Sequence, residues 1–135
     1  MDKESIKMRI SDILVVDDDI CCLNLLSICL KSEGFDVRTT SGGIEALEIL
    51  KHHKFRMIIT DFNMPDMDGI ELATRVREQN LGTPVVMITG NAKSDVIEAA
   101  VHAGITKVFS KPVNLRTLVG AITPWLHASQ DTVFA

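Results

Sequence analysis

The sequence has no basic stripe and no arginine-rich run. Among its 135 residues, 14 are Lys or Arg and 18 are Asp or Glu, which gives a formal net charge of −4 at pH 7. Proteins that bind nucleic acid carry clustered positive charge, because they must neutralise phosphates. Direct binding of nucleic acid is therefore not expected.

Long apolar runs are also missing. No stretch approaches the roughly 20 apolar residues that a helix needs to cross a bilayer. The segment from Met1 to Arg9 lacks the apolar core of a signal peptide. We predict a cytoplasmic location and no association with a membrane.

Cysteine is scarce, with only Cys21, Cys22 and Cys29. An odd number at helical spacing does not predict a disulfide framework, and neighbouring cysteines are poorly placed for an unstrained bridge. No histidine or second cysteine pair lies at ligand spacing, so a metal site at these thiols is not expected either. We predict three free thiols that pack as small hydrophobic groups.

What is present is enough for one domain. Apolar residues make up 46% of the chain, which can build a core, and charged residues make up an ordinary 24%. The length leaves no room for a second domain of usual size. We place the domain at residues 12–127, with an N-terminal extension over 1–11 and a loose tail over 128–135.

Short apolar runs rich in β-branched residues alternate with segments of helical periodicity. The first, third and fourth runs are nearly continuous, which is typical of strands buried on both faces of a sheet. The runs lie at Ile13–Val16, Val37–Thr40, Met57–Thr60, Val85–Thr89 and Val108–Phe109.

Each run is followed by apolar residues at helical spacing. In the first helix we place Cys22, Leu25, Leu26, Cys29 and Leu30 on the buried face. The other four stripes fall within residues 46–50, 72–76, 97–101 and 115–126.

Four residues are expected to mark the start or end of a helix or to kink it. Gly34 and Gly104 suit the ends of the first and fourth helices, and Asn114 suits the start of the fifth. Pro124 is expected to kink or shorten that last helix. We place His52–His53 in solvent at the end of the second helix, where they would interact weakly with its dipole.

The order strand–helix, repeated five times, predicts a parallel sheet whose crossover helices lie on both faces. The predicted fold class is α/β, a flavodoxin-like (βα)5 doubly wound sandwich with a five-stranded parallel sheet of order 2-1-3-4-5.

Polar residues follow the apolar runs at the ends where such sheets bind ligands. Asp17 and Asp18 follow the first run, Asp61 the third, and Lys111 the fifth, while Thr89 ends the fourth. Each of them alone has a plain structural explanation, but together at one sheet edge they predict a functional site. Asp19, the next residue, is as good a candidate for a helix N-cap as for a residue of this site.

This set of groups suits phosphoryl transfer. Crowded carboxylates raise one another's pKa, and a hard divalent cation relieves the repulsion. Mg²⁺ prefers oxygen ligands and takes one or two protein carboxylates, here Asp17 or Asp18 with Asp61. Thr89 and Lys111 can bind phosphoryl oxygens, and the isolated Asp61 can act as a nucleophile that forms an aspartyl phosphate.

These residues stand in motifs that resemble response-regulator receiver domains of two-component signalling. The motifs are Leu14–Asp18, Thr60–Pro65, Asp68–Gly69, Ile88–Gly90 and Phe109–Pro112, and the resemblance runs from about residue 12 to residue 126.

The resemblance implies a chemotaxis-regulator-like switch. Asp61 would be the phosphoacceptor, and Asp17, Asp18, Asp61 and the backbone carbonyl of Asn63 would bind Mg²⁺, with Mn²⁺ as a substitute. Thr89 and Lys111 would contact the phosphoryl group, and the bond from Lys111 to the following proline would be cis.

The resemblance also implies partners. The donor would be a phosphohistidine on a sensor histidine kinase or a histidine phosphotransfer protein. The downstream target is unknown, and its binding would use the fourth helix, fifth strand and fifth helix. The protein would be a monomer or a dimer promoted by phosphorylation, and would act alone or as part of a longer chain.

Two features set this sequence apart within the resemblance. The position three residues before Lys111, often aromatic in such domains, is Val108, and strand alternation turns Phe109 to the other face. Coupling of Thr89 to output is therefore expected to be weak or altered. Asn63 and Asn91, which would flank an attacking water, are neutral amides, so we predict a phosphoryl lifetime of minutes or longer.

Two other functions fit parts of the sequence. Asp17 and Asp19 form an Asp-x-Asp, as in haloacid-dehalogenase-type phosphatases, but the chain shows no cap domain or downstream acidic pair, and Asp61 would have no role. A pseudo-receiver that only binds partners would not need the complete set of chemical groups.

Overall fold

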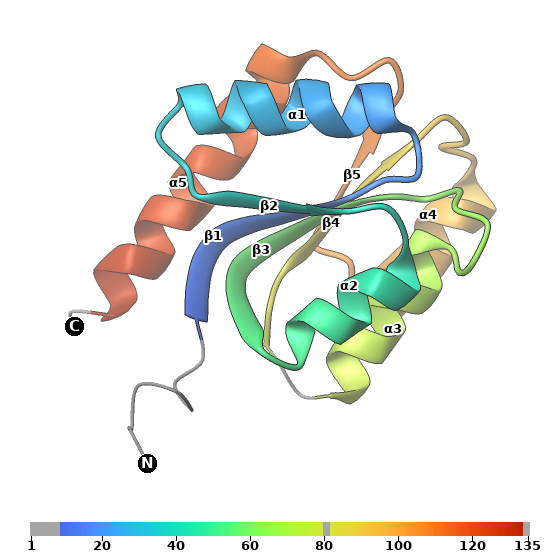
Figure 1. Cartoon of the computed structure of the whole chain (residues 1–135). Helices are drawn as coiled ribbons and strands as arrows, with labels where there is room; N and C mark the ends of the chain where they lie inside the picture. The colour runs from blue at the N-terminus through green and yellow to red at the C-terminus, as the bar shows by residue number, and fades with distance from the viewer. Residues whose placement is uncertain (1–8, 80–81, 134–135) are drawn as a thin grey trace.

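A computed structural model describes residues 9–79 and 82–133 (Figure 1). Strands and helices alternate strictly along the chain. They are β1 (Arg9–Val16), α1 (Ile20–Ser32), β2 (Val37–Thr40), α2 (Gly43–Leu50), β3 (His53–Asp61), α3 (Gly69–Glu78), β4 (Val85–Thr89), α4 (Ser94–His102), β5 (Lys107–Ser110) and α5 (Leu115–Val133).

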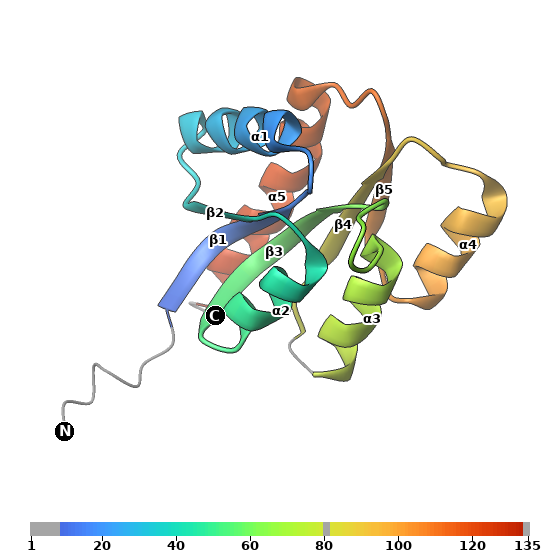
Figure 2. The same cartoon turned by 45° about the vertical axis from the view of Figure 1, so that its right-hand side comes forward.

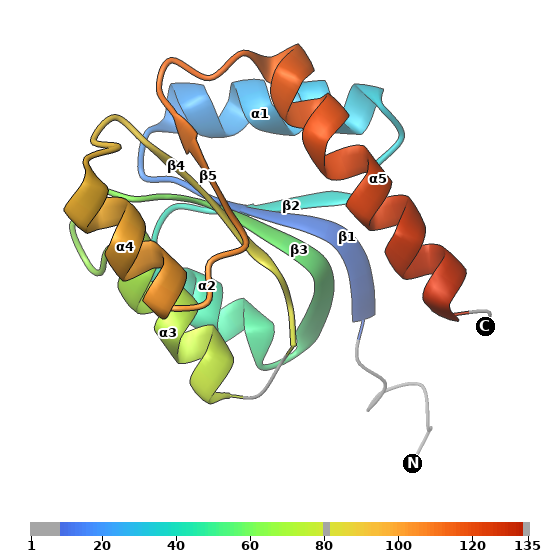
Figure 3. The same ribbon diagram turned by 180° about the vertical axis from the view of Figure 1, so that it is seen from behind.

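The five strands form one parallel sheet in the order β2-β1-β3-β4-β5. Helices α1 and α5 cover one face of the sheet, and α2, α3 and α4 cover the other (Figures 1 and 2). The view from behind shows α5 crossing the sheet on the same side as α1 (Figure 3). The predicted fold class and strand order are confirmed.

The central strands are buried on both faces because successive side chains point to opposite sides of a sheet. In β1, Leu14 and Val16 pack into the core beneath α2, α3 and α4. Their neighbours Ile13 and Val15 pack into the second core, beneath α1 and α5. All four are at most 1% exposed, which explains why the strand reads as a continuous apolar run.

Three strands are longer than predicted, and β5 (Lys107–Ser110) extends by one residue at each end. β1 begins at Arg9, so the last three residues of the predicted N-terminal extension are paired in the sheet. β3 begins at His53, which is buried and hydrogen-bonded to the Ser11 hydroxyl at 2.7 Å. The placement of His53 in solvent at a helix end was wrong, because its partner lies 42 residues away in sequence and gives no local signal.

The buried face of α1 also differs from the prediction. Leu26 and Leu30 are buried as expected, but Leu25 is 58% exposed, and the buried residues include Leu23 instead. The error arises because α1 also carries exposed Ile20 on its outer side. A helix with apolar residues on several sides has no periodicity that fixes its orientation.

Helix ends follow the predicted signals closely. Gly34 and Gly104 have positive φ angles of 94° and 88° just after α1 and α4, a conformation that glycine adopts at little cost. The Asn114 side chain accepts from Thr117 N at 3.1 Å at the start of α5. Asp19 is the N-cap of α1, accepting from two backbone N–H groups.

Residues 128–133, which the prediction placed in a loose tail, continue α5 as far as Val133. Pro124 lies inside the helix without ending it, so the prediction of a shortened helix was wrong. Position 120, whose carbonyl the Pro124 ring crowds, is a glycine. One residue earlier in the helix, the Thr123 hydroxyl donates to the Val119 carbonyl at 2.6 Å.

The structure can be compared with the predictions made for the cysteines and for membrane-spanning helices. Cys21, Cys22 and Cys29 are all free thiols, and Cys22 and Cys29 are half-buried as predicted, but Cys21 is exposed, against the prediction of a buried or half-buried thiol. Over residues 9–79 and 82–133, no helix combines the length and apolar character needed to cross a bilayer. The cytoplasmic location stays a prediction.

Candidate functional site

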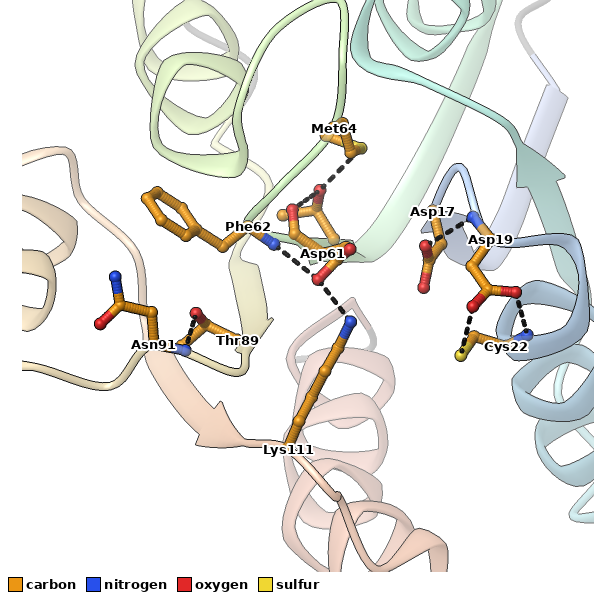
Figure 4. A network of polar contacts seen from close by, with 10 residues as sticks. Asp17, Asp19, Cys22, Asp61, Phe62, Met64, Thr89, Asn91 and Lys111 are labelled. Atoms are coloured by element: carbon orange, nitrogen blue, oxygen red, sulfur yellow. Dashed lines mark hydrogen bonds and ion pairs between the residues drawn. The ribbon is translucent and has the colours of Figure 1, made fainter.

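The carboxyl ends of four strands bring the predicted site residues together. Parallel pairing places Val16 of β1 beside Thr60 of β3, and Thr89 of β4 beside Ser110 of β5. The next residues along β1 and β3 are Asp17 and Asp61, which lie on either side of the site in the close view (Figure 4). Lys111, directly after β5, points between them (Figure 4).

Three carboxylates form the acidic part of the site. One oxygen from each of Asp17, Asp18 and Asp61 lies within 4.8 Å of the others. Asp17 and Asp61 are buried, at 4% and 8% exposure, and Asp18 is exposed. Burial raises the pKa of Asp17, and the charges of Asp61 and Asp18 raise it further, against a backbone hydrogen bond from Asp19 and the Lys111 charge.

This geometry fits a divalent cation. Two buried carboxylates and one exposed carboxylate offer only oxygen ligands, on a side open to water, which is the chemistry that Mg²⁺ prefers. The direction of the Asp17 pKa shows that its charge is poorly compensated by the protein alone. A bound cation would remove that deficit.

Lys111 is the counter-charge that the protein supplies. Its ammonium lies 2.9 Å from Asp61 Oδ1. Burial opposes the charge, but the hydrogen bond to Asp61 and the charges of Asp61 and Asp17 prevail and raise the pKa of Lys111. The same Oδ1 accepts from Phe62 N at 2.9 Å. Within the described part of the chain, no hydrogen bond reaches Oδ2.

Thr89 is buried at 1% exposure beside Lys111, whose backbone N–H donates to the Thr89 carbonyl at 2.8 Å. The Thr89 hydroxyl oxygen accepts from Asn91 N at 2.9 Å (Figure 4). Its own hydrogen therefore remains able to donate. The Asn91 side-chain oxygen is buried, and no hydrogen bond to it is found within the described residues.

Asn63 lies exposed in the loop between β3 and α3. That loop begins at Asp61 and closes on itself, since Gly69 N donates to the Phe62 carbonyl at 2.9 Å. A Cβ at Gly69 would lie 2.6 Å from the Asp61 carbonyl oxygen, so only glycine permits this approach. The end of the loop, where α3 begins, thus packs against the strand end that carries the candidate phosphoacceptor.

Val108 and Phe109, two residues of β5, point to opposite faces of the sheet. Val108 packs against the core under α2, α3 and α4, while Phe109 packs against the core under α1 and α5. The predicted alternation is confirmed, and Phe109 does not replace an aromatic residue at 108. The Lys111–Pro112 peptide bond is cis, as predicted.

The sequence matches the family described as "Response regulator receiver domain" over residues 13–123. The chain therefore belongs to the receiver domains of two-component signal transduction, which are not conventional enzymes. The phosphatase alternative is set aside, because the receiver-domain match covers residues 13–123, most of the chain.

The chain spans only a small part of the length of two curated relatives that it matches. The chain is 38% identical over 120 residues to the sensor histidine kinase RcsC of Salmonella typhimurium, covering 89% of this chain and 13% of that protein. It is 35% identical over 117 residues to the transcriptional regulatory protein GlrR of Escherichia coli, covering 87% of this chain and 26% of that protein.

Solved receiver domains match the fold over nearly their whole length. The CheY-like receiver domain protein of Methanospirillum hungatei superimposes with a TM-score of 0.83 at 28% identity. The match covers 93% of this chain and 99% of that one. The domain described here is therefore a complete receiver fold.

Proposed function

We propose that the protein is a phosphorylation-dependent switch that accepts a phosphoryl group from a phosphohistidine onto Asp61 in a Mg²⁺-dependent reaction. The observation that carries the proposal is the cluster of Asp17, Asp18 and Asp61 with a single neighbouring ammonium, that of Lys111. A buried arrangement with this excess of negative charge costs stability, so it suits a cation-assisted function better than a structural one.

The attacking atom is proposed to be Asp61 Oδ2. Oδ1 is held by Lys111 and Phe62 N, both at 2.9 Å, which fixes the carboxylate plane and leaves the second oxygen free to approach phosphorus. The new bond joins this oxygen to phosphorus while the P–N bond to the donor imidazole breaks. The electron pair of that bond stays on the imidazole nitrogen.

Lys111 and Thr89 are proposed to bind the transferred group. As phosphorus approaches, the ammonium can shift from Asp61 Oδ1 to a phosphoryl oxygen with little movement of its backbone. The Thr89 hydroxyl can donate to another oxygen while it continues to accept from Asn91 N. Both interactions stabilise charge on the phosphoryl oxygens.

Asp17, Asp18, Asp61 and the backbone carbonyl of Asn63 are the proposed holders of the metal. A bound Mg²⁺ would neutralise part of the negative charge of the phosphoryl oxygens. The chain's own contribution is to keep two of these carboxylates buried and close together, so that their alignment does not depend on the donor.

The proposed donor is a sensor histidine kinase or a histidine phosphotransfer protein, and RcsC, to which the chain is similar, is a sensor histidine kinase. A cavity of about 510 Å³ beside the site includes Asp17 and Lys111 and is otherwise lined mainly by apolar side chains. A donor that reaches Asp61 would cover this cavity. Binding of the downstream partner is proposed to use α4, β5 and α5. The coupling of Thr89 to this surface is proposed to be altered because position 108 is a valine. Phosphorylation is proposed to promote dimerisation as one outcome.

The proposal is tested by incubating the protein with acetyl phosphate, with and without Mg²⁺, and measuring intact mass. We expect one phosphoryl addition that needs Mg²⁺ and is absent in Asp61→Ala. Asp36→Ala, which removes an exposed acid outside the site, is the matched control and should behave as the wild type. Addition that persists in Asp61→Ala would overturn the choice of Asp61 and point to Asp17, whereas no addition to the wild type would favour a pseudo-receiver.

A further inference from the structure

Helix α2 begins without a side-chain cap of its own. Its N-cap residue is Gly42, which has no side chain, so the first N–H groups of the helix need acceptors from elsewhere. The acceptor is Asp66, which follows β3 in a different part of the chain. Its Oδ2 accepts from Ile44 N at 2.8 Å, and its Oδ1 faces Gly43 N at 3.3 Å.

Asp66 also belongs to the loop that leaves the phosphoacceptor. Its Oδ1 accepts from Met67 N at 2.8 Å, so one carboxylate joins the start of α2 to the loop between β3 and α3. The hydrogen bond from Ile44 N is the main reason that the pKa of Asp66 is lowered, with those from Met67 and Gly43 adding to it. The carboxylate therefore stays ionised at neutral pH, as a helix N-terminus favours.

The packing around this junction is close. A Cβ added at Gly42 would lie 2.8 Å from Asp66 Oδ2, and a Cβ added at Gly43 would lie 2.7 Å from Met67 Sδ and closer still to Met67 Cγ. Two successive glycines therefore allow the loop to rest directly on the helix start. Neither the loop nor the helix can shift without disturbing the other.

Asn63, the proposed source of a metal-binding carbonyl, lies three residues before Asp66 in the same loop. The loop is fixed at its start, where Phe62 N donates to the Ile88 carbonyl at 3.0 Å. The buried side chain of Met64 anchors the loop in the core under α2, α3 and α4. Asp66 is the point at which the far side of the loop is tied to another helix.

We propose that Asp66 is a positioning residue for the metal site, and that its bonds to the start of α2 fix the loop that carries Asn63. This inference rests on the proposed Mg²⁺ site. It gives α2, which contributes no group to the site, a role in metal affinity.

The first test compares Mg²⁺ binding by calorimetric titration in the wild type, Asp66→Ala and Asp66→Asn. Loss of an outer partner of a metal ligand commonly weakens binding by 10–100-fold. Because Met64 also anchors the loop, we expect the lower end, an increase in Kd of about tenfold in Asp66→Ala. Asp66→Asn keeps an amide oxygen that can accept from Ile44 N and should recover part of the affinity.

Asp68→Ala is the matched control. Asp68 lies in the same loop, and its side chain accepts from Glu71 N at 2.8 Å, but it caps α3, the helix that the loop itself enters. Both variants lose one helix cap. Only Asp66→Ala should change the Mg²⁺ Kd; equal weakening in both would mean that loop stability alone matters and would overturn the inference.

A second test approaches the junction from α2. Gly43→Ala should push Met67 and its loop away from the helix and weaken Mg²⁺ binding. In the double variant Gly43→Ala/Met67→Ala the colliding Cγ and Sδ are gone, and the remaining Met67 Cβ lies 3.7 Å from the added methyl group. We expect the double variant to recover affinity; weaker binding than in Gly43→Ala would contradict the inference.

The wild type separates this inference from the proposed function. If the wild type neither binds Mg²⁺ nor gains a phosphoryl group, the proposed function fails and the role of Asp66 fails with it. If the wild type does both and Asp66→Ala has the same Kd, only the positioning role is wrong.

Discussion

The two ends of the central strands differ in whether their polar and charged side chains have partners of opposite character. At the amino end of β1 and β3, polar groups are matched: the Ser11 hydroxyl contacts His53 Nε2 at 2.7 Å, and Arg56 Nε lies 3.3 Å from Asp12 Oδ1. At the carboxyl end, three carboxylates lie close together, and among the described residues the only ion pair there is that between Lys111 and Asp61.

The difference shows which end serves stability and which serves chemistry. Matched polar pairs cost little to bury and hold neighbouring strands in register. Unmatched carboxylates destabilise the fold until a cation or a phosphoryl group changes the local charge. Substitutions at the amino end should therefore lower stability without changing phosphorylation. Substitutions that remove a carboxylate at the other end should impair metal binding or phosphorylation without lowering the stability of the metal-free protein.

The largest effect is expected for Lys111→Ala. This substitution removes the only protein cation that contacts Asp61 within the described residues, and loss of one such stabilising group typically slows a reaction by about 100-fold or more. The initial rate of phosphorylation by acetyl phosphate, followed by intact mass, should fall by about that factor. A rate within about twofold of the wild type would show that Lys111 only balances charge in the resting state.

His53→Ala should lower stability by removing a paired group at the amino end of β3. The substitution leaves a space beside Phe55, on which the imidazole stacks at 4.6 Å between ring centroids, and removes the partner of Ser11. We expect the free energy of unfolding to fall by about 2 kcal/mol in urea titrations. The phosphorylation rate should be unchanged; a slower rate would mean that the two ends are coupled.

Asp17→Asn should stabilise the metal-free protein. Because the pKa of Asp17 is raised on folding, its contribution to stability is fully present below the unfolded value and is lost as the pH rises through the folded value. Asparagine mimics the neutral form, and its oxygen can still accept from Asp19 N. Stability at pH 7 should rise by about 1 kcal/mol.

The same variant should lose the effect of the metal. Mg²⁺ should raise the Tm of the wild type, as a ligand that binds only the folded state does, but should leave the Tm of Asp17→Asn nearly unchanged. Thermal melts at several pH values, with and without Mg²⁺, check both parts. Destabilisation of the metal-free protein by this substitution would contradict the view that the carboxyl end is strained by its charges.

The smallest effect is expected for Lys51→Ala. Lys51 and Glu48 form an exposed ion pair at 2.9 Å, with side-chain exposures of 58% and 64%. Exposed pairs of this kind contribute little because water screens them, and we expect no measurable change in the same urea titrations. This variant also serves as a lysine control for Lys111→Ala, since it should not slow phosphorylation.

Much of this comparison could be predicted from sequence, for a physical reason. The site residues directly follow or end β-branched runs, and parallel pairing necessarily brings such positions to one edge. Asp17, Asp61 and Lys111 therefore meet as expected. The strand order followed from the alternation of strands and helices at this length.

The features that could not be predicted depend on contacts between distant segments. Nothing near His53 reveals Ser11, and nothing near Gly42 reveals that Asp66 caps the next helix. The glycine pair at the start of α2, with no capping side chain, was the available signal for the second contact. For α1, the apolar Leu25 on the outer side hid the orientation of the helix.

The direction of α5 has a consequence for how this domain can be joined to others. The helix starts near Lys111 and runs for 19 residues, or about 28 Å, so its far end lies well away from Asp61. β1 starts about 26 Å before its carboxyl end, since it has 8 residues. Both ends of the described chain thus emerge on the side opposite the site (Figure 1). A fused module or an affinity tag at either end would leave the approach to Asp61 clear, so the domain can be tethered or immobilised without blocking its donor.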